Sequence, residues 1–472
     1  MPQLIHRKKF LQLSLLAPLS IAAKPFNFLN SNNLLHSNDN VTYYKVGDAE
    51  YEILRKGFNK RIDKKPGIIA LCKNTNGAAE AIQYAAKNNL PVAVKSGGHC
   101  MEGFSANNGG MVINTSVMKN IEWLDNETVK LEPGCRLSEI YDVLLPKKKI
   151  IPGGSCAGVG IGGLVLGGGY GLMARKFGLT CDSLQAITMV DGAGKIVTVS
   201  GTDELLWACK GGNNGNFGVV TELTFKVHKA PSLMQSHRFR AYKVDTERTK
   251  NILKKWFELT TTLPAECFSA FVLNGKTLYI LLTNVGKQTE AVKNFIAELK
   301  VITDKTTVSA PRPLAEALKA YYGRSNPMYF KNASAGLYKN FDEINTFVDK
   351  ALDIVISTPG MIYQVNTLGG NIQNTEFEKL SSFPHRSYPY FSELQTYWEL
   401  PSQEKRLLDR FEQVQQIFTG NNIKAQYRNY PDINFSSWPE LYYGSNYQRL
   451  QAIKAKYDPN NLFRYEQSIK KD

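Results

Sequence analysis

The chain has 472 residues, of which 43% are hydrophobic and 21% are charged, a balance that excludes a disordered or fibrous protein and suits two domains, or one large domain with a lobe. The 57 Lys and Arg residues outnumber the 42 Asp and Glu residues, and the net charge of +15 favours contact with anionic surfaces or substrates without identifying one. The sequence has no dense basic stripe with interleaved aromatic residues, so no nucleic-acid partner is predicted.

Residues 1–23 have the pattern of an export signal. Three basic residues at positions 7–9 precede an apolar run that ends in small residues, and this run is too short for a transmembrane helix of about 20 residues. The order Arg-Lys-Lys-Phe-Leu resembles a twin-arginine signal with one arginine replaced by lysine, and that pathway exports proteins already folded around their cofactors. We therefore expect a periplasmic or secreted protein with a linker at residues 24–50. The alternative is a basic terminus that stays attached.

Hydrophobic periodicity predicts an α/β beginning to the fold. Residues 68–71 and 91–94 have the apolar runs of buried strands, and between them a helical pattern begins at the cap Asn76. Further along, residues 188–199 predict a hairpin, and residues 218–227 predict a strand with alternating polar and apolar side chains.

The character of the chain changes after residue 231, where helices and strands mix as in a second, α+β domain. The predicted helices lie at residues 251–259, 287–300, 313–322 and 341–354, and the predicted strands at 269–273, 278–283 and 361–368. The last part of the chain has one predicted strand, at residues 424–430, and one amphipathic helix, at 447–456. Because this tail is too short to fold alone, it must pack on an earlier domain.

Seven cysteines stand at positions 72, 100, 135, 156, 181, 209 and 267. They form no C-x-x-C pair and have no histidine at metal-ligand spacing, so no metal site is predicted. An odd number leaves at least one thiol outside any intramolecular disulfide, and Cys156, beside glycines 153 and 154, is the thiol that chemistry could use.

The loop at residues 95–99, with the sequence KSGGH, directly follows a predicted strand. Its small residues allow a tight turn that presents backbone N–H groups, and such a nest binds pyrophosphate. His99 at its end would lie beside the group that carries the phosphates. The alternative is a structural histidine with ordinary hydrogen bonds.

A glycine-rich segment follows at residues 153–171. Residues 158–163 fit the pattern G-x-G-x-x-G, and an acidic residue, Asp182, follows about 20 residues later, as in a Rossmann fold. We reject that fold because the segment that should be helical contains four more glycines, each costing about 1 kcal/mol in a helix interior. We expect instead a backbone pressed against a flat, bulky cofactor.

The motifs at residues 96–99 and 103–105, at 153–163 and 167–171, and at 211–218 together resemble the PCMH-type FAD domain of the vanillyl-alcohol oxidase superfamily. The C-terminal sequences KYDPNNLF at residues 456–463 and QSI at 467–469 narrow the resemblance to the berberine bridge enzyme-like group. The resemblance implies a two-domain α+β fold, in which residues 51–230 bind FAD, residues 231–424 bind substrate, and residues 425–472 complete the FAD domain.

The resemblance also implies that FAD is attached twice, through His99 to the 8α-methyl group and through Cys156 to C6 of the ring. Double attachment raises the reduction potential of the flavin and holds it in an open pocket. The implied cofactor contacts are Lys95, Ser96, Gly97, Gly98, Ser105, Val159, Gly160, Gly163, Gly168, Gly169, Tyr170, Gly171, Asn214, Gly215, Asn216, Gly218, Val220 and Asn461. Lys95 stands where arginine is common, and Cys100 stands where serine is common.

The catalytic base implied by the resemblance is Tyr430, in the stretch Tyr-Arg-Asn-Tyr. In a strand, Tyr427 and Tyr430 would point to opposite faces, and Arg428 and Asp432 would share the face of Tyr430, where a cation favours phenolate. Three further residues resemble substrate-facing positions, with ordinary structural roles as the alternative. They are Gln364, His385 and Arg386.

The sequence therefore predicts a flavoprotein oxidase that moves a hydride from a hydroxyl-bearing carbon to FAD and reduces oxygen to hydrogen peroxide. The resemblance also implies an oxidase through Val159, since family members with valine at this position resemble oxidases, whereas members with a larger residue there tend to be dehydrogenases. A sugar is the first expected substrate, and a secondary-metabolite alcohol or amine is the second. The alternatives are a dehydrogenase, a flavin-free binding protein and a polyanion-binding protein.

Overall fold

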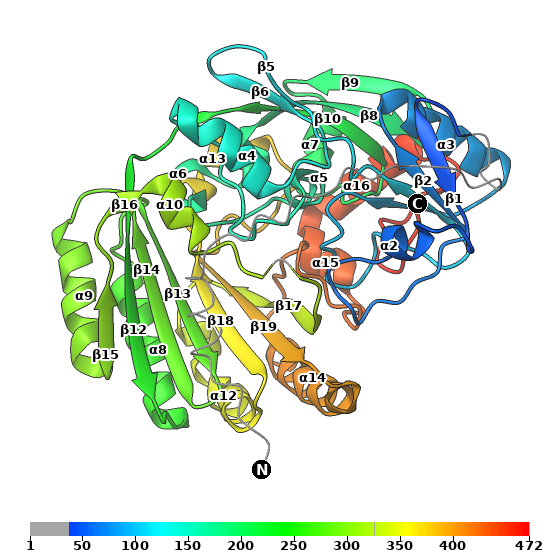
Figure 1. Ribbon diagram of the computed structural model, residues 1–472. Coiled ribbons are helices and arrows are strands. Elements are labelled where there is room, and N and C mark those ends of the chain that lie inside the picture. The colour runs from blue at the N-terminus through cyan, green and yellow to red at the C-terminus, as the bar shows by residue number, and fades with distance from the viewer. Residues whose placement is uncertain (1–36, 325, 472) are drawn as a thin grey trace.

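The predicted α/β beginning forms a small mixed sheet in the order β1-β2-β4-β3 (Figure 1). Its strands are β1 (Val41–Tyr44), β2 (Ile68–Cys72), β3 (Val92–Lys95) and β4 (Met111–Asn114), and helix α3 (Thr75–Lys87) packs on it. The side chain of Asn74 caps α3 by accepting a hydrogen bond from Gly77 N, so the predicted cap at Asn76 is wrong by two residues. Asn74 holds this place because it is the last extended residue before the helix.

The computed structural model describes residues 37–324 and 326–471. The expected export signal at residues 1–23 lies outside these residues, as does the first part of the expected linker. The second part of that linker contains β1, which pairs antiparallel with β2 and buries Val41 and Tyr43. The fold thus begins before Tyr51, because a short run of β-branched and aromatic residues completes one edge of the sheet.

The second sheet of the first domain is antiparallel, with the order β5-β6-β10-β8-β9. Its strands are β5 (Ile121–Trp123), β6 (Thr128–Leu131), β10 (Gly218–Lys226), β8 (Leu184–Asp191) and β9 (Ile196–Ser200). The predicted hairpin and the predicted strand at residues 218–227 are confirmed as β8–β9 and β10. The shorter elements are α2 (Tyr51–Arg55), α4 (Leu137–Leu144), β7 (Lys149–Ile150), α5 (Ile161–Leu166), α6 (Ala174–Phe177), α7 (Glu204–Cys209) and β11 (His228–Lys229).

The second domain is one large antiparallel sheet with helices on a single face (Figure 1). Its strand path is β15 (Lys305–Val308), β12 (Leu233–Tyr242), β14 (Thr277–Asn284), β13 (Cys267–Asn274), β18 (Met361–Thr367), β19 (Tyr390–Trp398) and β17 (Tyr329–Tyr338). The covering helices are α8 (Thr246–Thr260), α9 (Glu290–Ile302), α12 (Val348–Ser357) and α14 (Glu404–Gly420). The short elements are β16 (Arg312–Pro313), α10 (Leu314–Lys319), α11 (Asp342–Asn345) and α13 (Thr375–Lys379).

Strand alternation gives this sheet two different faces. In β13, Phe271 and Leu273 pack with the covering helices, whereas Phe268 and Ala270 belong to the core shared with the first domain. The sheet therefore turns its uncovered face toward the first domain.

The C-terminal part returns to the first domain through α15 (Trp438–Tyr443) and α16 (Tyr447–Tyr457). After α16, Phe463 forms a parallel bridge with Val92 of β3. The buried Lys454 Nζ donates a hydrogen bond to Asn216 O at 2.8 Å and forms an ion pair with Asp458 at 2.6 Å. These contacts fasten the tail to the first sheet.

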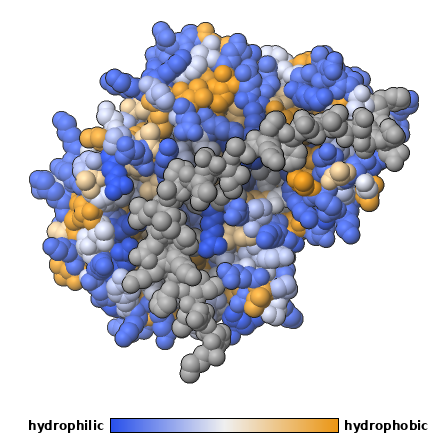
Figure 2. Space-filling view, in the orientation of Figure 1, coloured by the Kyte–Doolittle hydropathy of each residue, from blue (hydrophilic) through white to orange (hydrophobic). Residues whose placement is uncertain are grey.

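The surface has the polar character expected from the composition. On the face shown in Figure 2, hydrophobic residues form small groups between hydrophilic ones. Within the part of the chain that the structure describes, no helix combines the length and apolar character needed to cross a membrane.

Candidate active site

Three loops that the sequence analysis assigned to a cofactor meet at one place. The loop after β3 crosses the loop before α5 so closely that a Cβ at Gly97 would lie 2.3 Å from Gly160 N. The turn before β10 joins them, because Asn214 Nδ2 donates a hydrogen bond to Gly163 O at 3.3 Å. We call this arrangement the cofactor cradle. It consists of Ser96, Gly97, Gly98, Val159, Gly160, Gly163, Asn214 and Gly215.

The glycine run before and after α5 is required mainly by crossings within the protein. A Cβ at Gly171 would lie 2.1 Å from Gly153 O, and one at Gly169 would lie 2.4 Å from Thr180 Oγ1. Gly163 differs, since a Cβ there would meet nothing within 4 Å. The expectation that the whole run presses on a flat group is therefore wrong, and only part of the run is open to a cofactor.

Two predicted cofactor contacts use their side chains inside the protein instead. Lys95 Nζ donates hydrogen bonds to the backbone carbonyls of Leu54 (2.7 Å) and Lys56, and burial lowers the pKa of this ammonium to about 8. Asn216 Oδ1 accepts a hydrogen bond from Ile469 N at 2.9 Å. Both side chains stabilise the loops of the cradle from the protein interior. The remaining predicted cofactor contacts lie outside the cradle: in the loop after β3 (Ser105), after α5 (Gly168, Gly169, Tyr170 and Gly171), in β10 (Gly218 and Val220) and in the turn after α16 (Asn461).

The residues present fit an FAD group. Asn214 Oδ1 is buried and has no hydrogen-bond partner among the described residues, so a polar ligand can satisfy it. Gly98 has a φ of 70°, which is the conformation that turns successive N–H groups toward an anion. The open surface at Gly163 lies beside Asn214, whose Nδ2 donates a hydrogen bond to Gly163 O.

His99 lies at the end of the cradle with its ring stacked on Phe58, at a centroid distance of 4.4 Å. Its Nε2 would be 3.2 Å from a Cβ at Gly158, so the imidazole lies against the loop that carries Cys156. Burial, together with the charge of Arg136, lowers the pKa of His99 to about 4. The imidazole is therefore neutral at pH 7 and retains the lone pair that a nucleophile needs.

Cys156 lies in an exposed position on the same loop as Gly158. The neighbouring Ala157 N donates a hydrogen bond to Tyr322 O at 3.1 Å, which joins this loop to the second domain. Reduced hydration and the negative charge of Glu393 raise the pKa of the thiol. His99 and Cys156 thus belong to two neighbouring loops that meet at Gly158.

Tyr430 belongs to a cluster of aromatic rings. Its centroid is 5.4 Å from that of Tyr427, 6.1 Å from that of Tyr170 and 5.5 Å from that of Phe391. A small apolar cavity lies against Tyr170, Tyr427 and Phe391. Burial, Glu393 and Cys156 raise the pKa of Tyr430 well above 10, so its hydroxyl is protonated at rest.

The predicted strand at residues 424–430 is absent, and the argument from opposite faces is wrong. Tyr430 N donates a hydrogen bond to Tyr427 O at 3.0 Å, which is a turn that brings both phenols to one side. Tyr427 is distinguished by its partner, because its hydroxyl accepts a hydrogen bond from Gly169 N at 2.9 Å. Tyr427 therefore supports the glycine loop.

The expectation that Arg428 and Asp432 share the face of Tyr430, with the cation Arg428 favouring its phenolate, is also wrong. Arg428 donates its hydrogen bonds to other tyrosines, Tyr443 and Tyr465, and Asp432 forms a buried ion pair with Lys331 at 2.7 Å. A turn, unlike a strand, does not place residues i and i+2 on one face. Neither charged group directly assists the phenol of Tyr430.

A row of polar side chains on the uncovered face of the second sheet lies beside the phenols. We call it the polar sheet face. It comprises Asn332 of β17, Gln364 and Asn366 of β18, and Glu393 and Gln395 of β19. Glu393 lies at its centre and accepts hydrogen bonds from Asn332 (3.1 Å), Asn366 (3.2 Å) and Tyr170 (3.3 Å). Burial raises the pKa of this carboxyl.

Of the three predicted substrate residues, only Gln364 lies on the polar sheet face. His385 is buried and its Nε2 is hydrogen-bonded to Leu441 O at 2.8 Å. Arg386 forms an ion pair with Asp182 at 2.5 Å, in which both side chains are 1% exposed. The expectation for His385 and Arg386 is therefore wrong, because their polar atoms are bound by the protein.

Sequence reasoning missed four members of the polar sheet face: Asn332, Asn366, Glu393 and Gln395. A signal was present in β18, where Val365 separates Gln364 from Asn366, and in β19, where Leu394 separates Glu393 from Gln395. Residues 390–398 were not predicted as a strand, and in the predicted strand at residues 361–368 only Gln364 was expected to face the substrate.

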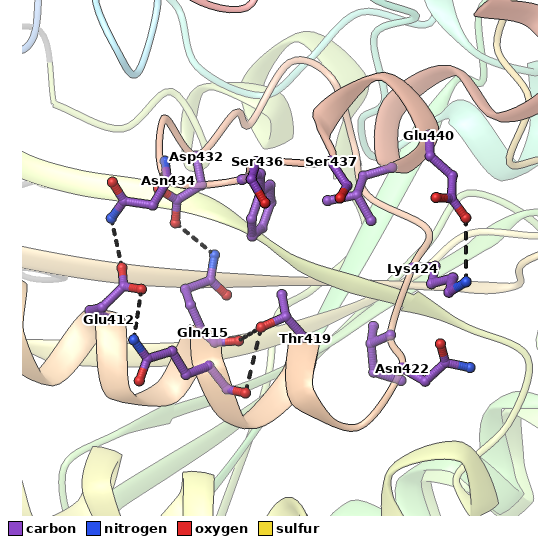
Figure 3. A pocket seen from close by; sticks show the side chains of 14 residues that line it. Glu412, Gln415, Thr419, Asn422, Lys424, Asp432, Asn434, Ser436, Ser437 and Glu440 are labelled. Carbon is purple, nitrogen blue, oxygen red and sulfur yellow. Dashed lines mark hydrogen bonds and ion pairs between the residues drawn. The ribbon is translucent and has the colours of Figure 1, made fainter.

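A second and larger hollow lies apart from this site (Figure 3). It is a polar cleft of about 330 Å³ between α14 and the segment that follows it. Asn434 Nδ2 donates to Glu412 Oε2 at 2.6 Å, and Lys424 pairs with Glu440 at 3.4 Å. No residue of the cradle or of the polar sheet face lines this cleft.

Comparison with known proteins agrees with this arrangement. Residues 66–200 match the family of the FAD binding domain, and residues 426–470 match the family described as berberine and berberine like. The chain is 32% identical over 435 residues to the "Uncharacterized FAD-linked oxidoreductase YgaK" of Bacillus subtilis, covering 89% of this chain and 95% of that protein. It is 28% identical to the chitooligosaccharide oxidase of Gibberella zeae, covering 88% and 89%.

Solved structures share the fold over nearly the whole chain. A chitooligosaccharide oxidase has a TM-score of 0.82 and 26% identity, with 92% of this chain and 97% of that chain covered. An aclacinomycin oxidoreductase has a TM-score of 0.83 and 26% identity, with 92% and 100% covered. The cofactor cradle, the two-domain α+β fold and these matches show that the chain is an FAD-linked oxidoreductase of the berberine bridge enzyme-like, PCMH-type family.

Proposed function

We propose that this protein is an exported oxidase that takes a hydride from a hydroxyl-bearing carbon of a mono- or oligosaccharide. The observation that carries the proposal is the polar sheet face, which places amide and carboxylate groups beside the phenol of Tyr430. Such groups bind the hydroxyls of a sugar. The similarity to proteins named glucooligosaccharide oxidase and carbohydrate oxidase supports the same substrate class.

Bound FAD would supply the redox chemistry: the alcohol would lose a hydride and its hydroxyl proton, and oxygen would gain two electrons and two protons, so that alcohol and oxygen become carbonyl compound and hydrogen peroxide. The protein supplies the route for the hydroxyl proton. Tyr430 takes this proton as it passes its own to Tyr170, which is hydrogen-bonded to it. Tyr170 in turn donates to Glu393 at 3.3 Å, and the raised pKa of Glu393 suits a proton acceptor.

A release assay for hydrogen peroxide tests the substrate class directly. Purified protein is mixed with mono- and oligosaccharides, simple alcohols and amines. Peroxide from sugars alone supports the proposal. Peroxide from amines or apolar alcohols alone overturns it, and so does reduction of an artificial acceptor without any peroxide.

We expect FAD to be attached through both His99 and Cys156, because the two loops that cross at the cradle carry the neutral imidazole and the thiol. Acid precipitation of the wild-type protein should leave all yellow colour in the pellet. The single variants His99→Ala and Cys156→Ala should each keep the colour in the pellet, and only the double variant should release it. Release from the wild type contradicts the proposal.

We expect oxygen to be the electron acceptor, with Val159 leaving the space for it. Val159 lies in the cradle between Cys156 and Gly160, and one added methylene can close a cavity of the size of dioxygen because protein interiors contain few voids. Val159→Ile should slow reoxidation by air at least tenfold, an effect of about 1.4 kcal/mol on the barrier. Anaerobic reduction by substrate, the control, should change less than twofold. Equal losses in both half-reactions contradict this role.

The proposed export in a folded state is supported by the cysteines. All seven are free, and five of them are buried. Folding in a reducing compartment protects such thiols, whereas an unfolded chain in an oxidising compartment exposes them to wrong pairing. Deleting residues 1–23 should leave the protein in the cytoplasm with full flavin content, which fractionation and absorbance at 450 nm measure.

A further inference from the structure

Arg428 is a buried cation that the proposed reaction does not use. Its residue is 4% exposed, and it lies among aromatic rings, with Cζ 5.6 Å from the ring centre of Phe104 and 5.4 Å from that of Tyr442. Nε donates to Tyr443 Oη at 2.9 Å, and Nη2 donates to Tyr465 Oη at 2.9 Å. Nη1 has no hydrogen-bond partner among the described residues.

No carboxylate balances this charge. Three of the other buried cations of the described chain have an acidic partner: Arg386 pairs with Asp182, Lys454 with Asp458 and Lys331 with Asp432. Two more, Arg175 and Lys95, are bound by backbone carbonyls. Arg428 has only two phenols, which are weaker acceptors, and an unbalanced buried charge is costly for a fold.

The surroundings of Arg428 lead to the cofactor cradle. Tyr465, its partner, donates a hydrogen bond to Asn214 O at 3.3 Å, and Asn214 is a cradle residue. The ring of Tyr465 stacks on Phe104 at 5.0 Å. Phe104 N in turn donates to Sγ of Cys100, the neighbour of His99. The guanidinium therefore lies behind the two loops that carry His99 and Asn214.

We propose that Arg428 supplies the positive charge that balances the negative charge of bound FAD. FAD carries negative charge in two places: permanently on its diphosphate, and on the ring system when it is reduced. A fixed cation close to either group stabilises it, and a cation beside the ring makes reduction more favourable. The same residue that fails to activate Tyr430 thus acts on the cofactor.

The test uses the purified holoenzyme and needs no substrate. Arg428→Gln removes the charge but keeps polar N–H donors, and Arg428→Met removes both. Two quantities are measured: the midpoint potential, by titration against a reference dye, and the ratio of flavin to protein. If Arg428 faces the ring, both variants shift the potential to more negative values, with at least a tenfold smaller ratio of reduced to oxidised flavin at a fixed potential. If it faces the diphosphate, flavin content falls and the potential stays constant.

Two variants serve as controls. Arg428→Lys keeps the charge and should stay near the wild type in both quantities. Tyr443→Phe removes one hydrogen bond of the guanidinium without removing charge, so it should lower the melting temperature and leave both quantities unchanged. The proposal is overturned if Arg428→Gln has the potential and the flavin content of the wild type. It is also overturned if Tyr443→Phe reproduces the effect of Arg428→Gln.

Discussion

Tyr430→Phe is expected to slow the anaerobic bleaching of the flavin by substrate by about 10²- to 10⁴-fold, the range of a general base. The phenol of Tyr430 is connected with the polar sheet face through Tyr170, which donates a hydrogen bond to Glu393. Stopped-flow absorbance at 450 nm measures this step without interference from oxygen. Binding of the sugar, measured through the concentration dependence of the rate, should change much less.

Tyr427→Phe is the matched control. Its hydroxyl holds Gly169 N, so the substitution should lower stability and slow bleaching by less than tenfold. If Tyr427→Phe and Tyr430→Phe lose the same activity, the assignment of the base fails.

Glu393→Gln should remove the rise of the bleaching rate with pH. In the wild type, protonation of Glu393, whose pKa is raised above 4.5, closes the proton route at low pH.

Arg386→Met is expected to lower the free energy of unfolding by about 3–5 kcal/mol, because it leaves Asp182 as an unpaired buried charge. This ion pair joins the two domains, since Asp182 belongs to the first and Arg386 to the second. Urea titration followed by tryptophan fluorescence measures the loss. The KM of the folded variant should stay within about twofold of the wild type.

Lys405→Met is the control for this prediction. Lys405 pairs with Asp409 at 2.7 Å, but its side chain is 87% exposed, and such pairs contribute about 0–1 kcal/mol. A similar loss from both substitutions would show that the burial of Arg386 is not the cause. A large rise in KM without loss of stability would restore Arg386 as a substrate residue.

The sequence predicted the fold best where one local signal decides the structure. The hairpin β8–β9 and the strand β10 have strict alternation and clear turns, and both were found. At residues 424–430 the same alternation failed. This segment runs beside β17 but exchanges only two backbone hydrogen bonds with it, from Leu337 N to Ala425 O and from Ser334 N to Tyr430 O. Its course depends on a distant strand, which local periodicity cannot reveal.

The residues of the candidate site likewise divide into those that a local sequence pattern predicts and those whose role depends on distant partners. The cradle residues were found because glycines in loops are a local requirement of backbone crossings such as that of Gly97 and Gly160. The role of Glu393 depends on three partners from β17, β18 and the loop after α5, which only the folded sheet assembles. His385 and Arg386 were misassigned for the same reason, since their partners Leu441 and Asp182 are distant in sequence.

The return of the C-terminal part to β3 also sets an order of events during synthesis. The strands of the second domain are contiguous in sequence and can pair as soon as they leave the ribosome, whereas Val92 must wait for Phe463. At about 5–20 residues per second, the first domain stays incomplete for roughly ten seconds or more after its own first 230 residues have emerged. Ile469 and Lys454, which hold Asn216 behind the cradle, come last. We therefore expect FAD to be loaded only after the ribosome has released the chain.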